Sequence, residues 1–201
     1  MTPISFASFR SSPIISVHEA LGADFLIWNQ MTVPKSYCKG VEYEHKTIRN
    51  AAGLTDMSGI KKIWLKGEGA LEVIDFLITR DCNNIKPGSA KYTALLDENG
   101  NLVDDAIVFR LSTQESDKFD ATWLICFGAG FGVDYLTKSL QDSKVVARAD
   151  DNKVCLMLQG PYAETVMTRV VKGGLTKNLG RFEHGLYSIL DSDVMLSLIH
   201  I

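Results

Sequence analysis

The sequence has only four cysteines, and none of them forms a close pair: Cys38, Cys82, Cys126 and Cys155 are scattered along the chain. A C-x-x-C pair is the usual signature of a structural zinc site or a redox motif, so we expect neither, and no metal site. Cysteines without a disulfide-like spacing are also typical of a reducing compartment. These observations predict a cytoplasmic protein without a bound metal.

Clusters of basic residues and long apolar runs are scarce as well. The net charge is −3, and the densest basic spot is the pair Lys61-Lys62, which we expect at a solvated strand edge. This charge pattern argues against nucleic acid as a partner. No run reaches the roughly 18 apolar residues that a spanning helix needs, so we expect no membrane segment.

The 201 residues do contain many short helix and strand signals. Apolar residues at three- and four-residue spacing predict helices at 14–23, 40–52, 69–79, 133–140 and 162–171. Shorter apolar runs predict strands at 25–28, 60–65, 92–96, 102–111, 121–127, 145–149 and 154–158, with a polar loop at 112–120. Asn99-Gly100 between two of these runs indicates a hairpin. Hairpins mixed with helices favour an α+β fold.

The most unusual local feature is Asp104-Asp105, two carboxylates inside an apolar strand. Side chains alternate along a strand, so one carboxylate is expected to face solvent and the other a core or a cleft. An inward carboxylate needs a reason, because its desolvation is costly. Two reasons remain open: a carboxylate poised over an amine nitrogen, or one that closes the hairpin by accepting backbone N–H bonds.

Other candidate sites are weaker. The glycine-rich segment 128–132 joins a predicted strand to a predicted helix, but its spacing matches neither GxGxxG nor a P-loop, so no nucleotide site is predicted. His18, His45 and His184 stand alone in the sequence, and we expect each to be structural.

Seven segments, taken in order, resemble the glycine-cleavage T-protein (aminomethyltransferase) family. They are 42–44 (Glu-Tyr-Glu), 49–58 (Arg-Asn-Ala-Ala-Gly-Leu-Thr-Asp-Met-Ser), 66–70 (Lys-Gly-Glu-Gly-Ala), 76–81 (Phe-Leu-Ile-Thr-Arg-Asp), 87–92 (Pro-Gly-Ser-Ala-Lys-Tyr), 98–105 (Glu-Asn-Gly-Asn-Leu-Val-Asp-Asp) and 158–161 (Leu-Gln-Gly-Pro). The resemblance implies a T-protein-type folate-binding fold, with mixed and antiparallel sheets flanked by helices. It also implies a discontinuous first subdomain, 1–50 plus 140–201, around an inserted α+β subdomain at 51–139.

The resemblance further implies a tetrahydrofolate site and a one-carbon transferase activity. Asp105, the second aspartate of the pair, is then the catalytic residue and binds the folate nitrogens, while Asp104 is structural. Tyr92 is expected to pack along the folate, and Ile60 to line it. A small-molecule one-carbon donor is the expected partner, and a lipoyl carrier protein is a second candidate.

Two departures from the family pattern keep alternatives open. The aminomethyltransferase branch continues its Asp-x-Ser motif with His-Met, whereas this chain has Gly59-Ile60, and the branch's asparagine and alanines are replaced at 127–130 by Phe-Gly-Ala-Gly. The alternatives are a tetrahydrofolate-dependent demethylase of a small N-, S- or O-methyl compound and a non-catalytic folate-binding protein.

The resemblance also predicts a truncated chain, because the family's Gly-Tyr-Thr-Gly-Glu segment and C-terminal domain do not follow. Residues 196–201 (Leu-Ser-Leu-Ile-His-Ile) match the translation of a transposon adapter used in sequencing libraries. We therefore expect adapter read-through there, with a natural apolar strand as the alternative, and expect the fragment alone to be inactive.

Overall fold

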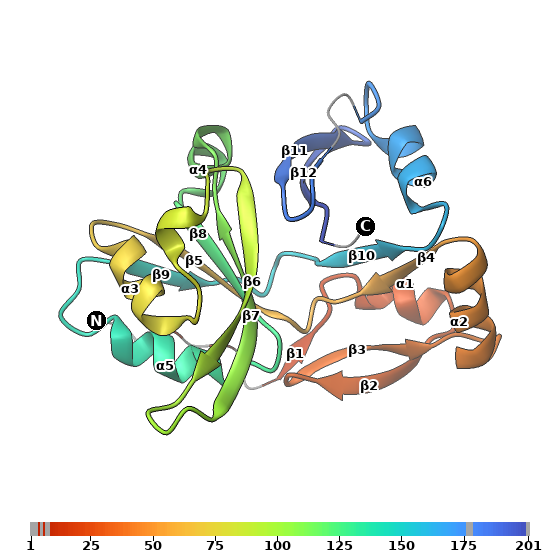
Figure 1. Cartoon of the computed structure of the whole chain (residues 1–201). Coiled ribbons are helices and arrows are strands. Elements are labelled where there is room, and N and C mark those ends of the chain that lie inside the picture. The colour runs from red at the N-terminus through yellow and green to blue at the C-terminus, as the bar shows by residue number, and fades with distance from the viewer. Residues whose placement is uncertain (1–3, 5, 7–8, 176–178, 200–201) are drawn as a thin grey trace.

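A five-stranded antiparallel sheet forms one lobe of the molecule (Figure 1). The structure, a computed structural model, describes residues 4, 6, 9–175 and 179–199. The sheet has the order β6-β7-β8-β5-β9, with strands β5 (Lys61–Lys66), β6 (Ser89–Leu96), β7 (Leu102–Arg110), β8 (Trp123–Phe127) and β9 (Val146–Ala149). Gly100, with a φ of 81°, makes the turn between β6 and β7, which only glycine adopts readily.

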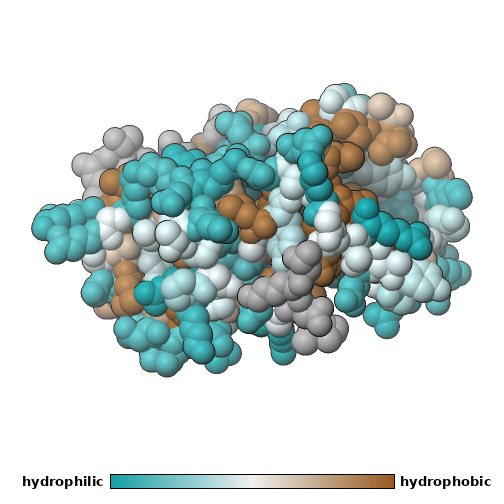
Figure 2. Space-filling model, turned by 90° about the horizontal axis from the view of Figure 1, so that it is seen from above, coloured by the Kyte–Doolittle hydropathy of each residue, from teal (hydrophilic) through white to brown (hydrophobic). Residues whose placement is uncertain are grey.

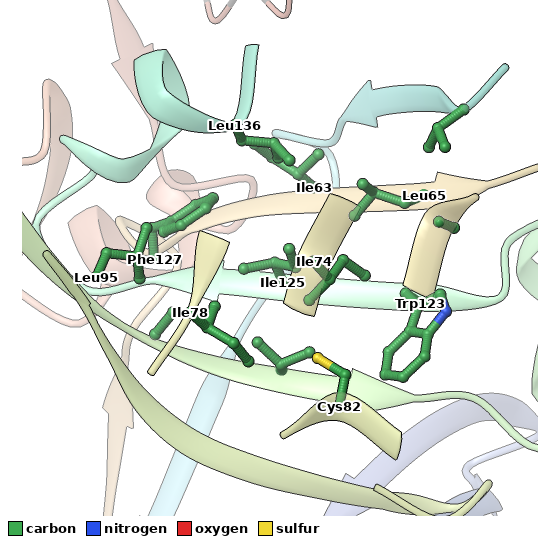
Figure 3. Close-up of a cluster of buried hydrophobic side chains, with 14 of the residues drawn as sticks. Ile63, Leu65, Ile74, Ile78, Cys82, Leu95, Trp123, Ile125, Phe127 and Leu136 are labelled. Atoms are coloured by element: carbon green, nitrogen blue, oxygen red, sulfur yellow. The ribbon is translucent and has the colours of Figure 1, made fainter. Parts of the chain in front are cut away.

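Helices α3 (Ala70–Leu77) and α5 (Gly132–Ser139) cover one face of this sheet. Alternate residues of the strands point into the interface, and Ile63, Ile125 and Phe127 are among those that become fully buried. Ile74 of α3 and Leu136 of α5 fill the space between helices and sheet (Figure 3). The 3₁₀ helix η1 (Cys82–Asn84) closes the same core with Cys82.

The opposite face of the sheet is only partly covered. A second cluster, centred on Trp64, Phe109 and Leu124, packs against Phe119 at the end of helix α4 (Thr113–Phe119) and against the ribbon of β11 (His184–Ile189) and β12 (Ser192–Ser197). Further along this face, towards the start of β7, Tyr92 is half exposed. The uncovered part of the face is where the predicted site residues lie.

The second lobe is built from smaller sheets and three helices (Figure 1). Its elements are β1 (Arg10–Ser11), α1 (Ile15–Ala20), β2 (Asp24–Trp28), β3 (Met31–Ser36), α2 (Gly40–Asn50), β4 (Gly53–Asp56), β10 (Leu156–Gln159) and α6 (Ala163–Val170). The chain passes from the second lobe to the sheet between β4 and β5 and returns between β9 and β10. The two crossings are joined by a hydrogen bond from Met57 N–H to Cys155 O (2.8 Å).

The predicted α+β class is confirmed, and two local predictions are wrong. Segment 112–120 is not a loop, because Ser112 and Glu115 form a capping box that begins α4. The pair Lys61-Lys62 is not at a sheet edge: β5 lies between β8 and β9, and Lys62 is 4% exposed.

The predicted division into 1–50 plus 140–201 around 51–139 stays a prediction. Strand pairing would favour boundaries nearer 60 and 150, because β9 belongs to the five-stranded sheet and β4 pairs with β10. Of the expected adapter segment 196–201, Leu196 and Ser197 pair within the β11–β12 ribbon, and residues 200 and 201 lie outside the described residues.

Large apolar side chains remain exposed on the second lobe. Tyr162, at the start of α6, and Val166 and Val170 follow one another at intervals of about one helical turn and are all at least a third exposed. Seen from above, apolar surface is visible on the side of the molecule that carries α6 (Figure 2). In the described part of the chain, no helix is both long enough and apolar enough to cross a membrane.

Candidate functional site

Asp104 and Asp105 point to opposite faces of β7. Asp104 faces the helix-covered core and is 3% exposed. Its carboxylate accepts hydrogen bonds from the backbone N–H groups of Ala129 (2.9 Å) and Gly132 (2.8 Å), and from Asp105 N–H (2.8 Å). Asp104 therefore holds the loop between β8 and α5 against the sheet.

Asp105 lies on the other, partly open face and is half-buried. The Tyr92 hydroxyl donates a hydrogen bond to Asp105 Oδ2 over 2.7 Å. This bond, together with the carboxylate charge, raises the pKa of the Tyr92 phenol above its ordinary value. Tyr92 and Asp105 thus form a phenol–carboxylate pair whose phenol stays protonated at neutral pH.

Gly128 lies directly against the Asp105 carboxylate of this pair. Its N–H donates to Asp105 O (2.9 Å), which continues the pairing of β7 with β8 by one residue. A Cβ at position 128 would overlap with Asp105 Oδ1, so only glycine leaves room for the carboxylate. The sequence signal for this role was the glycine-rich segment after a strand, which has no phosphate-loop spacing and instead accommodates a side chain.

Ile60 lies at the same end of the sheet as Asp105, as the strand order and the pairing of β5 with β8 show. Lys61 pairs with Phe127, so Ile60 precedes β5 at the level where Gly128 follows β8. The sheet order then places Tyr92 on β6, Asp105 on β7, Gly128 directly after β8 and Ile60 directly before β5, on or next to four successive strands. The three predicted residues therefore lie at one end of the sheet, and the direct contact among them is that of Tyr92 with Asp105.

Lys62 supports Ile60 and was missed by the sequence reasoning. Its Nζ donates hydrogen bonds to Ser58 O (2.9 Å) and Ile60 O (3.0 Å), which fixes the turn before β5. Burial lowers the pKa of the Lys62 ammonium. Two lysines in sequence gave no signal that one of them would be buried, because that depends on which strands flank β5.

Gly59 explains one departure from the family pattern. A Cβ at position 59 would lie 2.5 Å from Cε3 of the Trp28 ring, so the indole occupies the space that a larger residue would need. The histidine found at this position in the aminomethyltransferase branch would not fit beside Trp28.

The arrangement suits a flat, nitrogen-rich ligand. A half-buried carboxylate accepts hydrogen bonds from N–H donors, and charge-assisted bonds of this kind are the stronger ones. The Tyr92 ring offers a partly exposed aromatic surface, and the absence of a side chain at Gly128 allows close approach to the backbone. A carboxylate acceptor beside an aromatic face is the chemistry that a pterin ring, with its N–H donors and flat surface, requires.

Known proteins are similar to this chain in sequence. The family model described as "GCVT N-terminal domain" matches residues 14–186. The chain is 35% identical to the heme-dependent oxidative N-demethylase gamma subunit of Ectopseudomonas mendocina, over 94% of this chain and 48% of the relative. It is 32% identical to the aminomethyltransferase of Chlorobaculum tepidum, over 86% of this chain and 47% of the relative.

A solved structure shows the same fold. The crystal structure of the glycine cleavage system aminomethyltransferase T from Bartonella henselae matches with a TM-score of 0.75 and 28% identity, covering 88% of this chain and 47% of that one. The chain spans about half the length of the curated relatives it matches. The predicted resemblance is confirmed, and the chain belongs to the GCVT N-terminal domain family, to which the glycine-cleavage T-protein is a structural match.

Proposed function

We propose that this chain carries the folate-binding part of a tetrahydrofolate-dependent one-carbon transferase of the aminomethyltransferase type. The observation that carries the proposal is the Tyr92–Asp105 pair on the open face of the sheet, seated against Gly128. Family membership supports the same reaction class.

In this proposal each residue has a separate task. Asp105 is the catalytic residue: its carboxylate accepts a hydrogen bond from a folate N–H and stabilises positive charge that develops at the reacting nitrogen. Tyr92 orients the Asp105 carboxylate and packs along the ring, and Ile60 contributes an apolar wall. When bound, tetrahydrofolate supplies the nitrogen that takes up the one-carbon unit from a small-molecule donor.

A tetrahydrofolate-dependent demethylase is the second candidate, and two observations favour it. The N-demethylase gamma subunit matches at 35% identity, against 32% for the aminomethyltransferase of Chlorobaculum tepidum. Trp28 also fills the space of the histidine that the aminomethyltransferase branch carries. A subunit that releases the carbon of an N-methyl compound would then replace the lipoyl carrier protein as the partner.

The four free thiols support a reducing compartment, and we place the protein in the cytoplasm.

Calorimetric titration of the intact protein with tetrahydrofolate tests the proposed function. Asp105→Asn should weaken binding by about 10- to 150-fold, which corresponds to the roughly 1.5–3 kcal/mol of a hydrogen bond to a charged group. Asp117→Asn, on the exposed side of α4, is the matched control and should bind like the wild type. Failure of the wild type to bind tetrahydrofolate would overturn the proposal.

The donor is identified in a second experiment. The intact protein is supplied with tetrahydrofolate and either an aminomethyl-loaded lipoyl carrier or a small N-methyl amine with its oxidising subunit. Formation of methylene-tetrahydrofolate with the carrier alone supports the first candidate, and formation with the N-methyl amine alone supports the second.

A further inference from the structure

The turn that joins β2 to β3 reaches from the second lobe towards the end of the sheet that holds Asp105. Trp28 pairs with Met31, so Asn29 and Gln30 form a two-residue turn, and their φ angles of 49° and 64° are those of a type I′ hairpin. Arg10 fixes this turn: its Nη1 donates to Asn29 O over 2.7 Å and its backbone N–H donates to Gln30 O over 3.2 Å. These two hydrogen bonds hold the backbone of the turn in one conformation.

The Asn29 side chain bridges the two lobes. Its Nδ2 donates a hydrogen bond to Gly128 O over 2.7 Å, across 99 positions of sequence. Asn29 is half-buried by this contact, whereas its neighbour Gln30 in the same turn is exposed. The two turn residues share a backbone conformation and differ in whether the side chain reaches the other lobe.

The loop that Asn29 holds needs external support. It contains Gly128, Gly130 and Gly132, and glycines lose more conformational freedom on ordering than any other residue. Asp104 fixes the loop from the sheet by accepting two of its N–H groups. Asn29 fixes the Gly128 carbonyl from the second lobe.

Movement of the Gly128 peptide changes the space available to Asp105. The Gly128 Cα lies against the Asp105 carboxylate so closely that a Cβ would overlap with Oδ1, and the Gly128 N–H is bonded to Asp105 O. The hydrogen bond from Asn29 therefore acts on the direction of the carboxylate through a single glycine. No intervening side chain is available to absorb a shift.

We propose that Asn29 is a positioning residue for Asp105: by holding the Gly128 carbonyl from the second lobe, it keeps the Asp105 carboxylate directed at the folate nitrogens. This inference rests on the proposed function and extends it, because it makes folate affinity depend on a contact between the lobes. Asn29 acts through Gly128, and Asp105 remains the residue that contacts the ligand.

Two glycine substitutions in the same turn give a matched test. Glycine adopts positive φ without strain, so neither Asn29→Gly nor Gln30→Gly should disturb the turn, and only Asn29→Gly removes the carboxamide. Asn29→Gly should weaken tetrahydrofolate binding by roughly three- to tenfold, the effect of one lost neutral hydrogen bond. Gln30→Gly should change the affinity by less than about twofold.

A double-mutant cycle with Asp105→Asn separates positioning from general support. If Asn29 acts through Asp105, Asn29→Gly should cost less than about twofold in the Asp105→Asn protein. Asn29→Asp serves as a second variant, because it keeps the size and the tolerance for positive φ but cannot donate to Gly128 O. It should reproduce the loss, with circular dichroism confirming the folded state.

The outcomes distinguish the two proposals. If the wild type binds tetrahydrofolate and Asp105→Asn weakens binding, while Asn29→Gly binds like the wild type or its effect simply adds to that of Asp105→Asn, the role of Asn29 is overturned and the proposed function stands. If the wild type does not bind, both are overturned.

Discussion

Two adjacent aspartates on β7 carry out different tasks because strand geometry sends them to different environments. Asp104 is buried, and three backbone N–H groups donate hydrogen bonds to its carboxylate. Asp105 is half-buried and shares its carboxylate with a single phenol. Asp104 does satisfy backbone N–H groups, but those of the loop after β8, whereas the N–H groups of the β6–β7 hairpin are satisfied by Asp97. Asp105 stands at an open face, and its role towards an amine nitrogen stays a prediction.

Replacing each aspartate by alanine should separate these tasks. Asp104→Ala leaves the N–H groups of Ala129 and Gly132 without their acceptor, and each buried unsatisfied group costs about 1–3 kcal/mol. We expect the free energy of unfolding to fall by roughly 3 kcal/mol or more, measured by urea denaturation. Asp105→Ala should lower it by less than about 1 kcal/mol. Equal losses for the two variants would contradict this assignment.

Gly128→Ala tests the contact between Gly128 and Asp105. The added methyl group overlaps with Asp105 Oδ1, and overpacking of this kind typically costs about 1–3 kcal/mol of stability. In an Asp105→Ala background the obstacle is gone, so the same substitution should cost less than about 0.5 kcal/mol. Urea denaturation of the four proteins of this cycle measures the difference. A cost that persists in the Asp105→Ala background would show that another group limits position 128.

Among the secondary-structure elements, α4 shows best what the sequence could and could not predict. Segment 112–120 is polar and has no apolar stripe, so periodicity indicated a loop. The helix forms because Ser112 and Glu115 satisfy each other's backbone groups, and S-x-x-E is a signal that could have been read from the sequence. The strands with clear apolar patterns and the Asn99-Gly100 hairpin were predictable, because their signals are local.

The burial of Glu115 was not predictable, since it depends on a strand far along the chain. His184 of β11 hydrogen-bonds to Glu115 through Nδ1 (2.7 Å), and both side chains are fully buried. Burial acts to raise the pKa of the Glu115 carboxyl. The hydrogen bonds from His184 and Ser112, together with the charge of His184, outweigh burial and lower this pKa below its usual value of 4.5.

A lowered pKa in the folded state sets the sign of a pH effect. Glu115 contributes stability that is fully present above the unfolded-state pKa, near 4.5, and is lost as the pH falls through the lower folded-state pKa. Glu115→Gln should lower the free energy of unfolding by about 1–3 kcal/mol at pH 7. The difference in free energy of unfolding between wild type and variant should become smaller below about pH 4.5. Urea denaturation at several pH values measures it.

Glu68→Gln is the control for this effect. Glu68 forms an exposed ion pair with Lys144, and such pairs contribute about 0–1 kcal/mol. The free energy of unfolding of Glu68→Gln should stay close to that of the wild type at every pH. If the difference in free energy of unfolding between Glu115→Gln and the wild type does not change with acidification, Glu115 is not charged in the folded protein.

For the whole molecule, the contacts that hold the two lobes together join segments about a hundred residues apart. Asn29 meets Gly128, and Ser58 Oγ accepts a hydrogen bond from Cys155 N–H across 97 positions. Periodicity and turn motifs describe single elements and cannot specify such pairs. The resemblance to a family predicted Asp105, Tyr92 and Ile60 as site residues, and this stays a prediction. The parts played by Gly128 and Lys62 depend on the strand order of the sheet, and that of Asn29 depends on the contact between the lobes, so none of the three could be predicted from local sequence.

Thiol reactivity offers a measurement of how tightly the two lobes are held together. Cys38 is exposed, whereas Cys82 is buried and its pKa is raised to about 12 by desolvation. Burial also raises the pKa of Cys126, in strand β8, and of Cys155, in the crossing from β9 to β10 at the junction of the lobes; both lie near Lys62. At pH 8 a disulfide reagent such as dithiobisnitrobenzoate should therefore modify Cys38 rapidly and the other three at least about a hundredfold more slowly, because the thiolate is the reactive form.

The slow reactions identify which part of the molecule opens first. In urea all four thiols should react at similar rates, and Cys38→Ser should abolish the fast phase of the native protein. Cys82 belongs to the core of the five-stranded sheet, so its rate reports opening of that core. If Cys155 reacts faster than Cys82 and Cys126, which both belong to the lobe of the five-stranded sheet, the junction opens while the sheet stays folded, and the support that Asn29 gives to Gly128 is then released by local opening. Equal rates for Cys82, Cys126 and Cys155 would mean that lobes and sheet open as one cooperative unit.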